Sequence, residues 1–195
     1  FGRAGMDELE GGSGDDTLDA GNGQDVLFGG LGDDTLIGGT SSTLGSNTIA
    51  VPAQGAEIFA GDLDGDGDLD LVISTVTVDQ VVWLENNNGD GTSWTQHLVV
   101  TIDEPTTSWA DDVDGDGDLD IIATARDTMD KISWMENDNG DGSSWTEHFV
   151  SAADYCNGAY SADIDGDGDT DLLSASSHTD LVAWHENTSG DGSTW

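Results

Sequence analysis

The chain has 195 residues, enough for one good-sized domain or two small ones, and it carries 41 acidic residues against three Lys and Arg, a formal net charge of −38. Such acidity repels phosphate, so nucleic acids and anionic membrane surfaces are excluded as partners. No apolar run is long enough to span a bilayer, and one cysteine cannot form an internal disulfide. Similar acidity is typical of disordered tails, but here the acids recur at fixed positions beside Trp, Val, Ile and Leu, which favours a folded chain.

Residues 1–39 form a nine-residue repeat whose four rows begin at Gly2, Gly11, Ala20 and Gly29. Every row has Gly at position four, Asp at position six and Leu at position eight, although Arg3 and Ala20 depart from the Gly-Gly start of a row. Glycine at position four permits a turn with positive φ. The position-six acids are Asp7, Asp16, Asp25 and Asp34, and the position-eight residues are Leu9, Leu18, Leu27 and Leu36.

This pattern resembles the repeats-in-toxin (RTX) nonapeptide. The resemblance implies a short parallel β-roll in which two rows make one coil. It further implies that the position-six Asp residues and backbone carbonyls bind Ca²⁺ while the Leu side chains fill the core. Four rows make a short stack. Residues 40–47 (TSSTLGSN) have the composition of a linker that runs into the next segment of the chain.

The sequence DLDGDGDLD at residues 62–70 recurs with small changes at residues 112–120 and 163–171. Five acids on alternate positions repel one another, and their hard oxygens suit Ca²⁺, which takes six to eight oxygen ligands. Acids at loop positions one, three and five followed by a Gly allow the chain to curl around such an ion. An EF-hand needs a Glu at position twelve, where this chain has Ile73, Ala123 and Ser174. An apolar run follows each loop, so each loop is predicted to lead into a β-strand.

More than the loop recurs with this period of about fifty residues. The motif Trp-x-Glu-Asn begins at Trp83, Trp134 and Trp184, and a Gly-Asp-Gly turn and a further Trp follow each copy. Each copy is predicted to form four short strands. In the first copy, strand A is 58–61, strand B 71–76, strand C 80–86 and strand D 94–101. This spacing is typical of a β-propeller blade, and no stretch has the length and period of a helix.

The repeat resembles the FG-GAP or VCBS-type repeat of integrin-like propellers, whose D-x-D-x-D-G-x-x-D loop all three copies match. The F-G-x-x-G-A-P start of the family's strand A is not preserved. The resemblance implies calcium ligation by four Asp side chains and one Asp carbonyl in each loop. The implied ligands are Asp62, Asp64, Asp66, Asp68 and Asp70; Asp112, Asp114, Asp116, Asp118 and Asp120; and Asp163, Asp165, Asp167, Asp169 and Asp171.

The predicted architecture is therefore all-β, with a short parallel β-roll followed by three four-stranded blades at about 44–101, 102–151 and 152–195. The third blade has no strand D, whereas the segment 44–51 precedes the first strand A as strand D precedes the second. This orphan strand is predicted to complete the open edge either in cis or in trans; in trans it would give head-to-tail assembly. Another interpretation is that the chain is a segment of a longer array.

Few residues outside the acidic loops suggest chemistry. Zinc spacing and the G-x-S-x-G motif are absent, and Cys156 is expected to be a small buried residue. Because every clustered acid has a calcium explanation, we expect no enzyme. Most Trp residues are expected in the core, with Trp109 the more exposed one. Asn187-Thr188-Ser189 is a weak N-glycosylation motif, expected to be accessible.

The sequence thus predicts an extracellular, bacterial-type, calcium-binding structural or adhesive repeat protein whose fold depends on the ions. Its partners would be calcium and either further copies of itself, joined into a filament by strand exchange, or neighbouring repeats of a longer chain. The alternatives are a ligand- or glycan-binding propeller, like a lectin or an integrin head, and an accessory module of a larger secreted protein.

Overall fold

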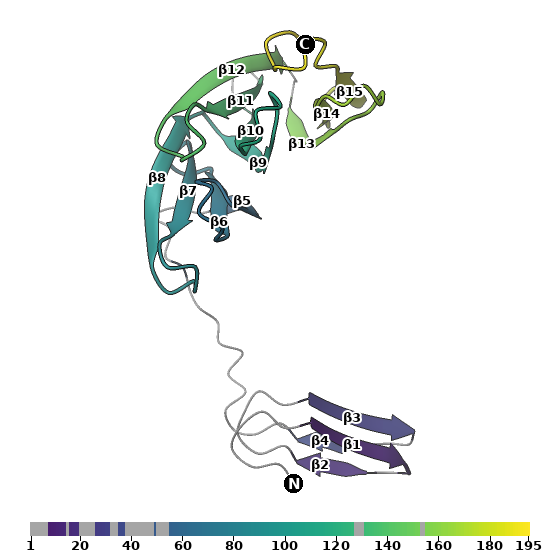
Figure 1. The fold of residues 1–195 in the computed structure, drawn as a ribbon. Helices are drawn as coiled ribbons and strands as arrows, with labels where there is room; N and C mark the ends of the chain where they lie inside the picture. Colours follow the sequence, from purple (N-terminus) through teal and green to yellow (C-terminus); the bar gives the residue numbers. More distant parts are fainter. Residues whose placement is uncertain are drawn as a thin grey trace. The chain divides into compact units, whose positions relative to one another are not determined.

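The computed structural model describes residues 8–14, 16–19, 26–31, 35–37, 49, 55–126, 131–152 and 155–195. These residues form fifteen β-strands (Figure 1) and no helix, which confirms the predicted all-β class. No helix in these ranges therefore has the length and apolarity to cross a bilayer. The chain divides into two compact parts, Phe1–Thr48 and Ile49–Trp195.

The first part contains short strands that pair in parallel. Strand β1 (Glu8–Ser13) pairs with β3 (Val26–Leu31), and β2 (Thr17–Asp19) pairs with β4 (Thr35–Ile37). The register places Leu9 beside Leu27 and Leu18 beside Leu36, so each row pairs with the second row after it. Leu18 is buried, as expected for position eight. Of the position-six acids, Asp16 is described, whereas Asp7, Asp25 and Asp34 lie outside the described residues.

The second part is built from three antiparallel sheets, one for each fifty-residue repeat. We call them repeat 1 (residues 55–101), repeat 2 (105–152) and repeat 3 (156–195). Repeat 1 has the order β5 (Gly55–Gly61), β6 (Asp70–Thr75), β7 (Gln80–Asn86) and β8 (Trp94–Thr101). Repeat 2 contains β9 (Pro105–Asp111), β10 (Asp120–Ala125), β11 (Lys131–Asn137) and β12 (Trp145–Ala152) in the same order.

Repeat 3 has three strands, β13 (Cys156–Ala162), β14 (Asp171–Ser176) and β15 (Leu181–His185). The expected absence of a fourth strand from this sheet is thus confirmed for the described residues. Of the orphan segment 44–51, the structure describes Ile49; the other residues of that segment lie outside the described ranges. Ile49 packs against Ile73, Val82 and Leu84 of repeat 1.

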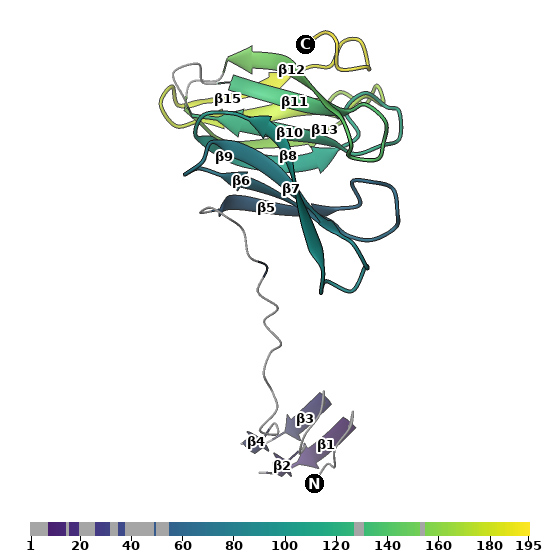
Figure 2. The same ribbon diagram turned by 90° about the vertical axis from the view of Figure 1, so that its left-hand side faces the viewer.

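The three sheets follow one another along a curve with their faces in contact (Figures 1 and 2). Strand β9 lies against β5 and β6, and β13 lies against β9 and β10, so the first strands of successive repeats are neighbours. We call the face of a repeat that looks toward the preceding repeat its front and the opposite face its rear. Each seam between repeats contains an apolar cluster made by the rear of one sheet and the front of the next.

Strand C has a continuous apolar run because both faces of its sheet are covered, and successive side chains of the run point to opposite faces. In repeat 1, Val81 and Trp83 enter the seam with repeat 2, where they meet Ile121 and Met135. Ile132 and Trp134 occupy the equivalent positions in the second seam, beside Leu172. Burial of these side chains on both sides of each sheet is what holds the repeats together, at about 25 cal/mol for each Å² of apolar surface removed from water.

Candidate metal centres in the Asp-rich loops

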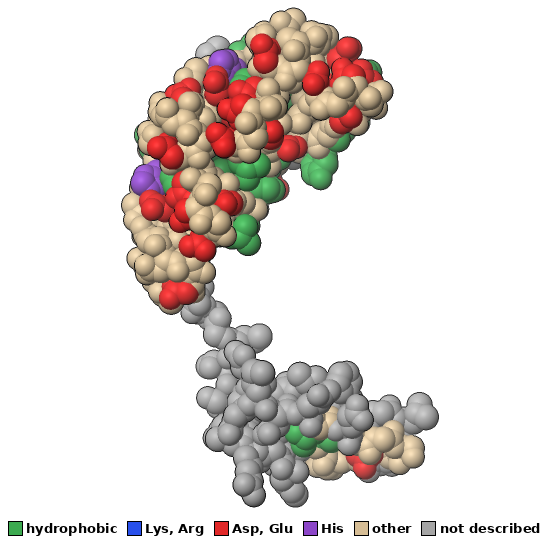
Figure 3. Space-filling model, viewed as in Figure 1, with side chains coloured by type: hydrophobic (Ala, Val, Ile, Leu, Met, Phe, Trp, Pro, Cys, Tyr) green, Lys and Arg blue, Asp and Glu red, His purple; other side chains and the backbone are tan. Residues whose placement is uncertain are grey.

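The three Asp-rich loops, residues 62–70, 112–120 and 163–171, each join strand A to strand B at the same edge of their sheets. In every loop, three carboxylates offer oxygen atoms that lie within 4.8 Å of one another. The converging groups are Asp62, Asp64 and Asp66; Asp112, Asp114 and Asp120; and Asp163, Asp165 and Asp171. Figure 3 shows acidic side chains gathered over these parts of the repeats.

Hydrogen bonds within each loop explain why the acids converge. The amide of Gly67 donates to Asp62 Oδ2 at 3.0 Å, and the amide of Asp66 donates to Asp64 Oδ1 at 3.2 Å. The other two loops repeat both bonds, at Gly117 and Asp116 and at Gly168 and Asp167. These bonds turn the chain back on itself and hold the first carboxylates toward the interior of the loop.

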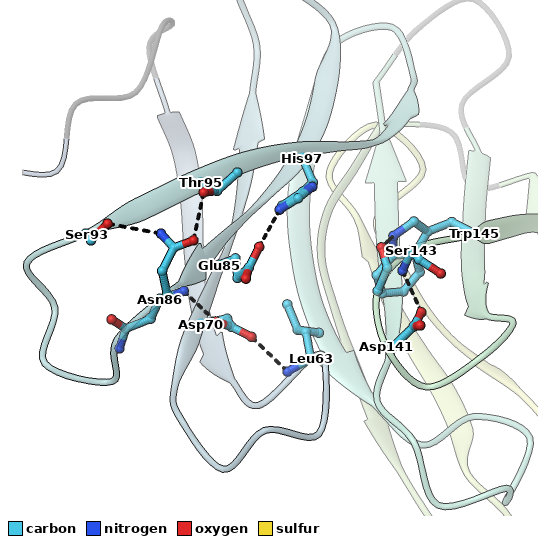
Figure 4. Close-up of polar contacts among 12 residues, drawn as sticks. Leu63, Asp70, Glu85, Asn86, Ser93, Thr95, His97, Asp141, Ser143 and Trp145 are labelled. Atoms are coloured by element: carbon cyan, nitrogen blue, oxygen red, sulfur yellow. Dashed lines mark hydrogen bonds and ion pairs between the residues drawn. The ribbon is translucent and has the colours of Figure 1, made fainter.

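The last acid of each loop ties the loop to strand C. Asp70 accepts hydrogen bonds from Leu63 N through one carboxylate oxygen (3.1 Å) and from Asn86 N through the other (2.8 Å), as Figure 4 shows. Asp120 and Asp171 make the equivalent pairs of bonds. Each oxygen keeps a second lone pair for a cation. Asp70, Asp120 and Asp171 are buried, so this closure lies at the base of the loop.

The Asp residue at position seven of each loop has a different orientation. The carboxylates of Asp68, Asp118 and Asp169 lie directly against Gly89, Gly140 and Gly190 in the turn between strands C and D, where a Cβ would clash with them. They are absent from the three groups of converging acids. This placement is compatible with a backbone carbonyl as the ligand at position seven, which is the form of ligation that the family resemblance implies.

Burial raises the pKa of several loop acids. It raises the pKa of Asp120 to about 7 and that of Asp70 above its ordinary value, and hydrogen bonds from backbone amides offset part of the effect. Burial also raises the pKa of Asp64 and Asp114. Carboxylates that share a site and leave water resist ionisation unless a positive charge joins them. Asp62 Oδ1 is buried and has no hydrogen-bond partner among the described residues, so its lone pairs are available to a cation.

The acids of the Gly-Asp-Gly turns differ from the loop acids. Asp90 accepts bonds from the amide and hydroxyl of Thr92, which hold its pKa below the ordinary value. Hydrogen bonds from Ser189 and Ser193 lower the pKa of Asp191 to about 2. In these exposed turn acids the hydrogen-bond donors outweigh burial and lower the pKa, whereas in the buried loop acids burial outweighs the donors and raises it. The arrangement therefore favours the loops, and not the turns, as cation sites.

One repeated side chain, for which the sequence suggested no role, connects each of the first two loops to the repeat that follows it. Asn137 donates from Nδ2 to Leu119 O in its own repeat (3.3 Å) and to Leu63 O in the loop of repeat 1 (2.9 Å), and its Oδ1 accepts from Gly142 N (3.0 Å). Asn187 makes the equivalent contacts, including one to Val113 O at 3.1 Å. The recurrence of Asn at the end of Trp-x-Glu-Asn was the signal, but the partner in another repeat could not be read from it.

The burial of Asn187 also corrects the expectation that its glycosylation motif is accessible. Its side chain is 0 % exposed, and both its amide nitrogen and its oxygen are engaged in these bonds. A glycan on Nδ2 is incompatible with this fold.

Trp109 was expected to be the exposed tryptophan, and this expectation is wrong. It is 8 % exposed, and its indole nitrogen donates to Ser161 Oγ of repeat 3 at 2.9 Å. The seam between repeats 2 and 3 covers its ring, so Trp109 does not offer a surface for sugar stacking. Cys156 is buried, as expected, and burial raises the pKa of its thiol.

The two histidines of strand D form part of the packing over strand C. His97 stacks on Trp83 with ring centroids 4.5 Å apart and contacts Glu85 at 2.8 Å (Figure 4). His148 repeats this arrangement with Trp134 and Glu136. Both histidines thus pack on the Trp of their own repeat, and neither belongs to the groups of converging acids.

Comparison with known protein families identifies both repeat systems. The model of the RTX calcium-binding nonapeptide repeat (4 copies) matches residues 1–36, so this segment has calcium-binding repeats. The model of the FG-GAP-like repeat matches residues 62–123 and 112–174, which together extend from 62 to 174 and span more than half of the chain. A search of curated proteins found no match. Both repeat types are structural or binding modules in general, and the chain belongs to the FG-GAP-like repeat family, preceded by RTX calcium-binding nonapeptide repeats.

Proposed function

We propose that this protein is a non-enzymatic extracellular scaffold, structural or adhesive, in which calcium ions hold the repeats in their folded form. The observation that carries the proposal is the threefold recurrence of converging carboxylates within loops that share the same hydrogen bonds. We assign the side chains at loop positions one, three, five and nine and the carbonyl at position seven as ligands. RTX repeats are typical of secreted bacterial proteins, which supports the extracellular assignment.

When bound, calcium supplies the positive charge that the three Lys and Arg residues cannot provide for 41 acids. The residues of the chain then transmit the order of the loop. The position-nine Asp joins the loop to strand C by accepting from one amide of each, and the Asn at the end of strand C fixes its own repeat to the loop of the preceding one. Closing the loop and joining the repeats are therefore one process, and the ions stabilise both.

We further propose that the three sheets are propeller-type blades and that residues 1–39 form a β-roll with Asp7, Asp16, Asp25 and Asp34 as calcium ligands. The proximity of the first strands of successive repeats supports the former. The parallel pairing of rows eighteen residues apart, such as Leu9 with Leu27, supports the latter. The domain limits we propose are 1–39, a linker at 40–47 and the repeats from 44 to 195.

The scaffold also supports assembly by strand exchange. Strand β15 has no partner on its outer side among the described residues, whereas the equivalent strands β7 and β11 pair with β8 and β12. Ile49, the described residue of the segment 44–51, packs against Ile73, Val82 and Leu84 of repeat 1. In the sequence, residues 44–51 precede the first Asp-rich loop by the same interval, eighteen residues, as β8 precedes the second, and we propose this segment as the strand that completes β15.

Calcium titration of metal-free protein tests the proposal. We expect β-type circular dichroism and the melting temperature to rise together as calcium is added, and EGTA to reverse both. Folding coupled to metal binding predicts this result. Magnesium is the control, because its smaller octahedral shell suits loops of six to eight oxygen ligands poorly. A chain whose spectrum and melting temperature are the same with calcium and with EGTA contradicts the proposal.

A further inference from the structure

The glutamate of the repeated Trp-x-Glu-Asn motif stands next to the Asp-rich loops but is not among their converging acids. In repeats 1 and 2 it is Glu85 or Glu136, in the last part of strand C. The antiparallel register of β6 and β7, continued by one residue beyond the pair Leu71–Leu84, places Asp70 opposite Glu85. The register of β10 and β11 places Asp120 opposite Glu136 in the same way. Each glutamate is therefore the cross-strand neighbour of the position-nine acid of its loop.

The charges of these glutamates act on the loops. Two carboxylates directly opposite each other on one face of an antiparallel pair repel. Burial is the largest cause of the raised pKa of Asp64 and Asp114, the position-three acids, and the charge of Glu85 or Glu136 raises it further. Asp114 feels the glutamate of its own repeat, so each glutamate belongs to one loop. A negative charge at this place is favourable when a cation occupies the loop.

A histidine from strand D holds each glutamate in place. His97 Nε2 lies 2.8 Å from Glu85 Oε2 (Figure 4), and His148 Nε2 lies 2.7 Å from Glu136 Oε2. A carboxylate can only accept, so the ring N–H of the histidine donates. Each ring is in turn stacked on the strand C tryptophan of its repeat. The second oxygen of each glutamate, Oε1, has no hydrogen bond with the described residues and remains available to water.

We infer that Glu85 and Glu136 determine the ion specificity of the first and second Asp-rich loops, as outer carboxylates whose charge favours bound ions of higher charge. The inference rests on the proposed calcium scaffold and adds two residues to its sites. Coulomb attraction is proportional to the charge of the ion, so an added negative charge favours a divalent over a monovalent cation, and a trivalent over a divalent one. His97 and His148 are positioning residues that keep the two carboxylates beside their loops.

Exchange of calcium for La³⁺ measures this preference in the folded 195-residue chain. La³⁺ has nearly the size of Ca²⁺ and one more charge, so the exchange tests charge and not the fit of the loop. The amides of Gly67, Gly117 and Gly168 each donate to the first acid of their own loop. Their ¹H–¹⁵N NMR signals therefore report the exchange at the three loops separately.

Two substitutions remove one charge each and keep the shape of the side chain. With Glu85→Gln, we expect the preference for La³⁺ over Ca²⁺ to fall roughly threefold or more at the first loop and to stay the same at the other two. Glu136→Gln should have the same effect at the second loop alone. Glu57→Gln is the matched control, because Glu57 is an exposed residue of β5 and its substitution removes the same charge from repeat 1. Circular dichroism in calcium verifies that each variant folds.

His97→Phe tests the positioning role. Phenylalanine keeps an aromatic ring over Trp83 but has no N–H to donate to Glu85. We expect the preference for La³⁺ at the first loop to fall, by less than it falls in Glu85→Gln, because the charge is still present but no longer fixed. A preference equal to that of the wild type would overturn the role of the histidine.

The inference is overturned if Glu85→Gln leaves the first loop unchanged, changes all three loops alike, or has no more effect than Glu57→Gln. Glu136→Gln applies the same criteria to the second loop, independently of whether Glu85→Gln folds. Glycine signals that respond to calcium in the wild type leave the proposed scaffold standing in each of these cases. Glycine signals that do not respond to calcium at all refute the scaffold and, with it, the inference.

Discussion

Repeats 2 and 3 have nearly the same pattern of residues, but they do not have the same environment. The rear face of repeat 2 is covered by repeat 3, which buries Trp134, Ile132 and the loop residue Val113. In repeat 3, the equivalent residues are exposed. The acids show the same trend, because Asp112 and Asp114 are half-buried whereas Asp163 and Asp165 are exposed.

The difference teaches that a repeat of this kind is not an independent unit of stability. The loops of repeats 1 and 2 are completed by hydrogen bonds from their own strand C and from the next repeat, so the environment of a loop depends on the repeat that covers it. This is the nearest-neighbour behaviour expected of repeat proteins. It predicts that a substitution in repeat 2 will cost more than the same substitution in repeat 3.

The largest difference is expected for the position-nine acids. In calcium, Asp120→Ala removes a ligand and leaves Val113 N and Asn137 N without their acceptor, and we expect a loss of about 3–5 kcal/mol in the free energy of unfolding. Asp171→Ala should cost roughly half as much, because water can reach the more exposed loop around Ile164. Urea denaturation of both variants provides the comparison. Equal losses would contradict the role of the neighbouring repeat.

The turn glycines offer a second matched pair. Gly142 and Gly91 both have positive φ, +65° and +70°, so alanine strains either backbone by about 1–2 kcal/mol. At Gly142 the added methyl also enters the indole of Trp83, which should add about 1–3 kcal/mol of overpacking. Melting at concentrations where the chain is monomeric separates the two contributions. If Gly91→Ala proves the more damaging, the turn of repeat 2 does not pack on Trp83 as the structure shows.

Low pH should partly replace calcium in the metal-free protein. Because burial raises the pKa of Asp120 to about 7, the folded chain binds a proton that the unfolded chain lacks between about pH 4 and 7. Stability from this group is therefore lost as pH rises toward 7, and we expect more β-structure at pH 5 than at pH 8. In the presence of calcium we expect the opposite, less β-structure at pH 5 than at pH 8, because protons compete with calcium for the carboxylate ligands. Asp120→Asn, which cannot ionise, should flatten the metal-free dependence.

The smallest effect is expected for the histidines of strand D. His148→Ala removes the ring stacked on Trp134 and a half-exposed contact with Glu136, for a cost of about 1 kcal/mol. Tryptophan emission should shift to longer wavelength, as the indole of repeat 2 becomes more like the exposed Trp184. His97→Ala should give a shift of similar size, and a shift from neither variant would show that both rings stay shielded without the stacked His.

Local features explain which parts of the fold could be predicted from the sequence. Strands β7 and β8 begin and end at the predicted residues, 80–86 and 94–101, because the alternation of side chains and the Gly-Asp-Gly turn define them within a short stretch. The loop acids converge because bonds over two to five residues hold them. The predictions for Trp109 and Asn187 were wrong because their burial depends on neighbouring repeats, from which a short stretch of sequence carries no signal.

The sequence by itself determined the repeat, its strands and the acids that gather in each loop, since all of these arise from contacts close along the chain. Only the tertiary structure decided which loops are covered, which Trp rings are buried and which acids have a raised pKa. These properties come from the packing of one sheet on the next, which joins residues such as Asn137 and Leu63 that are 74 positions apart. Burial, and with it charge and stability, is a property of the stacked array and not of the single repeat.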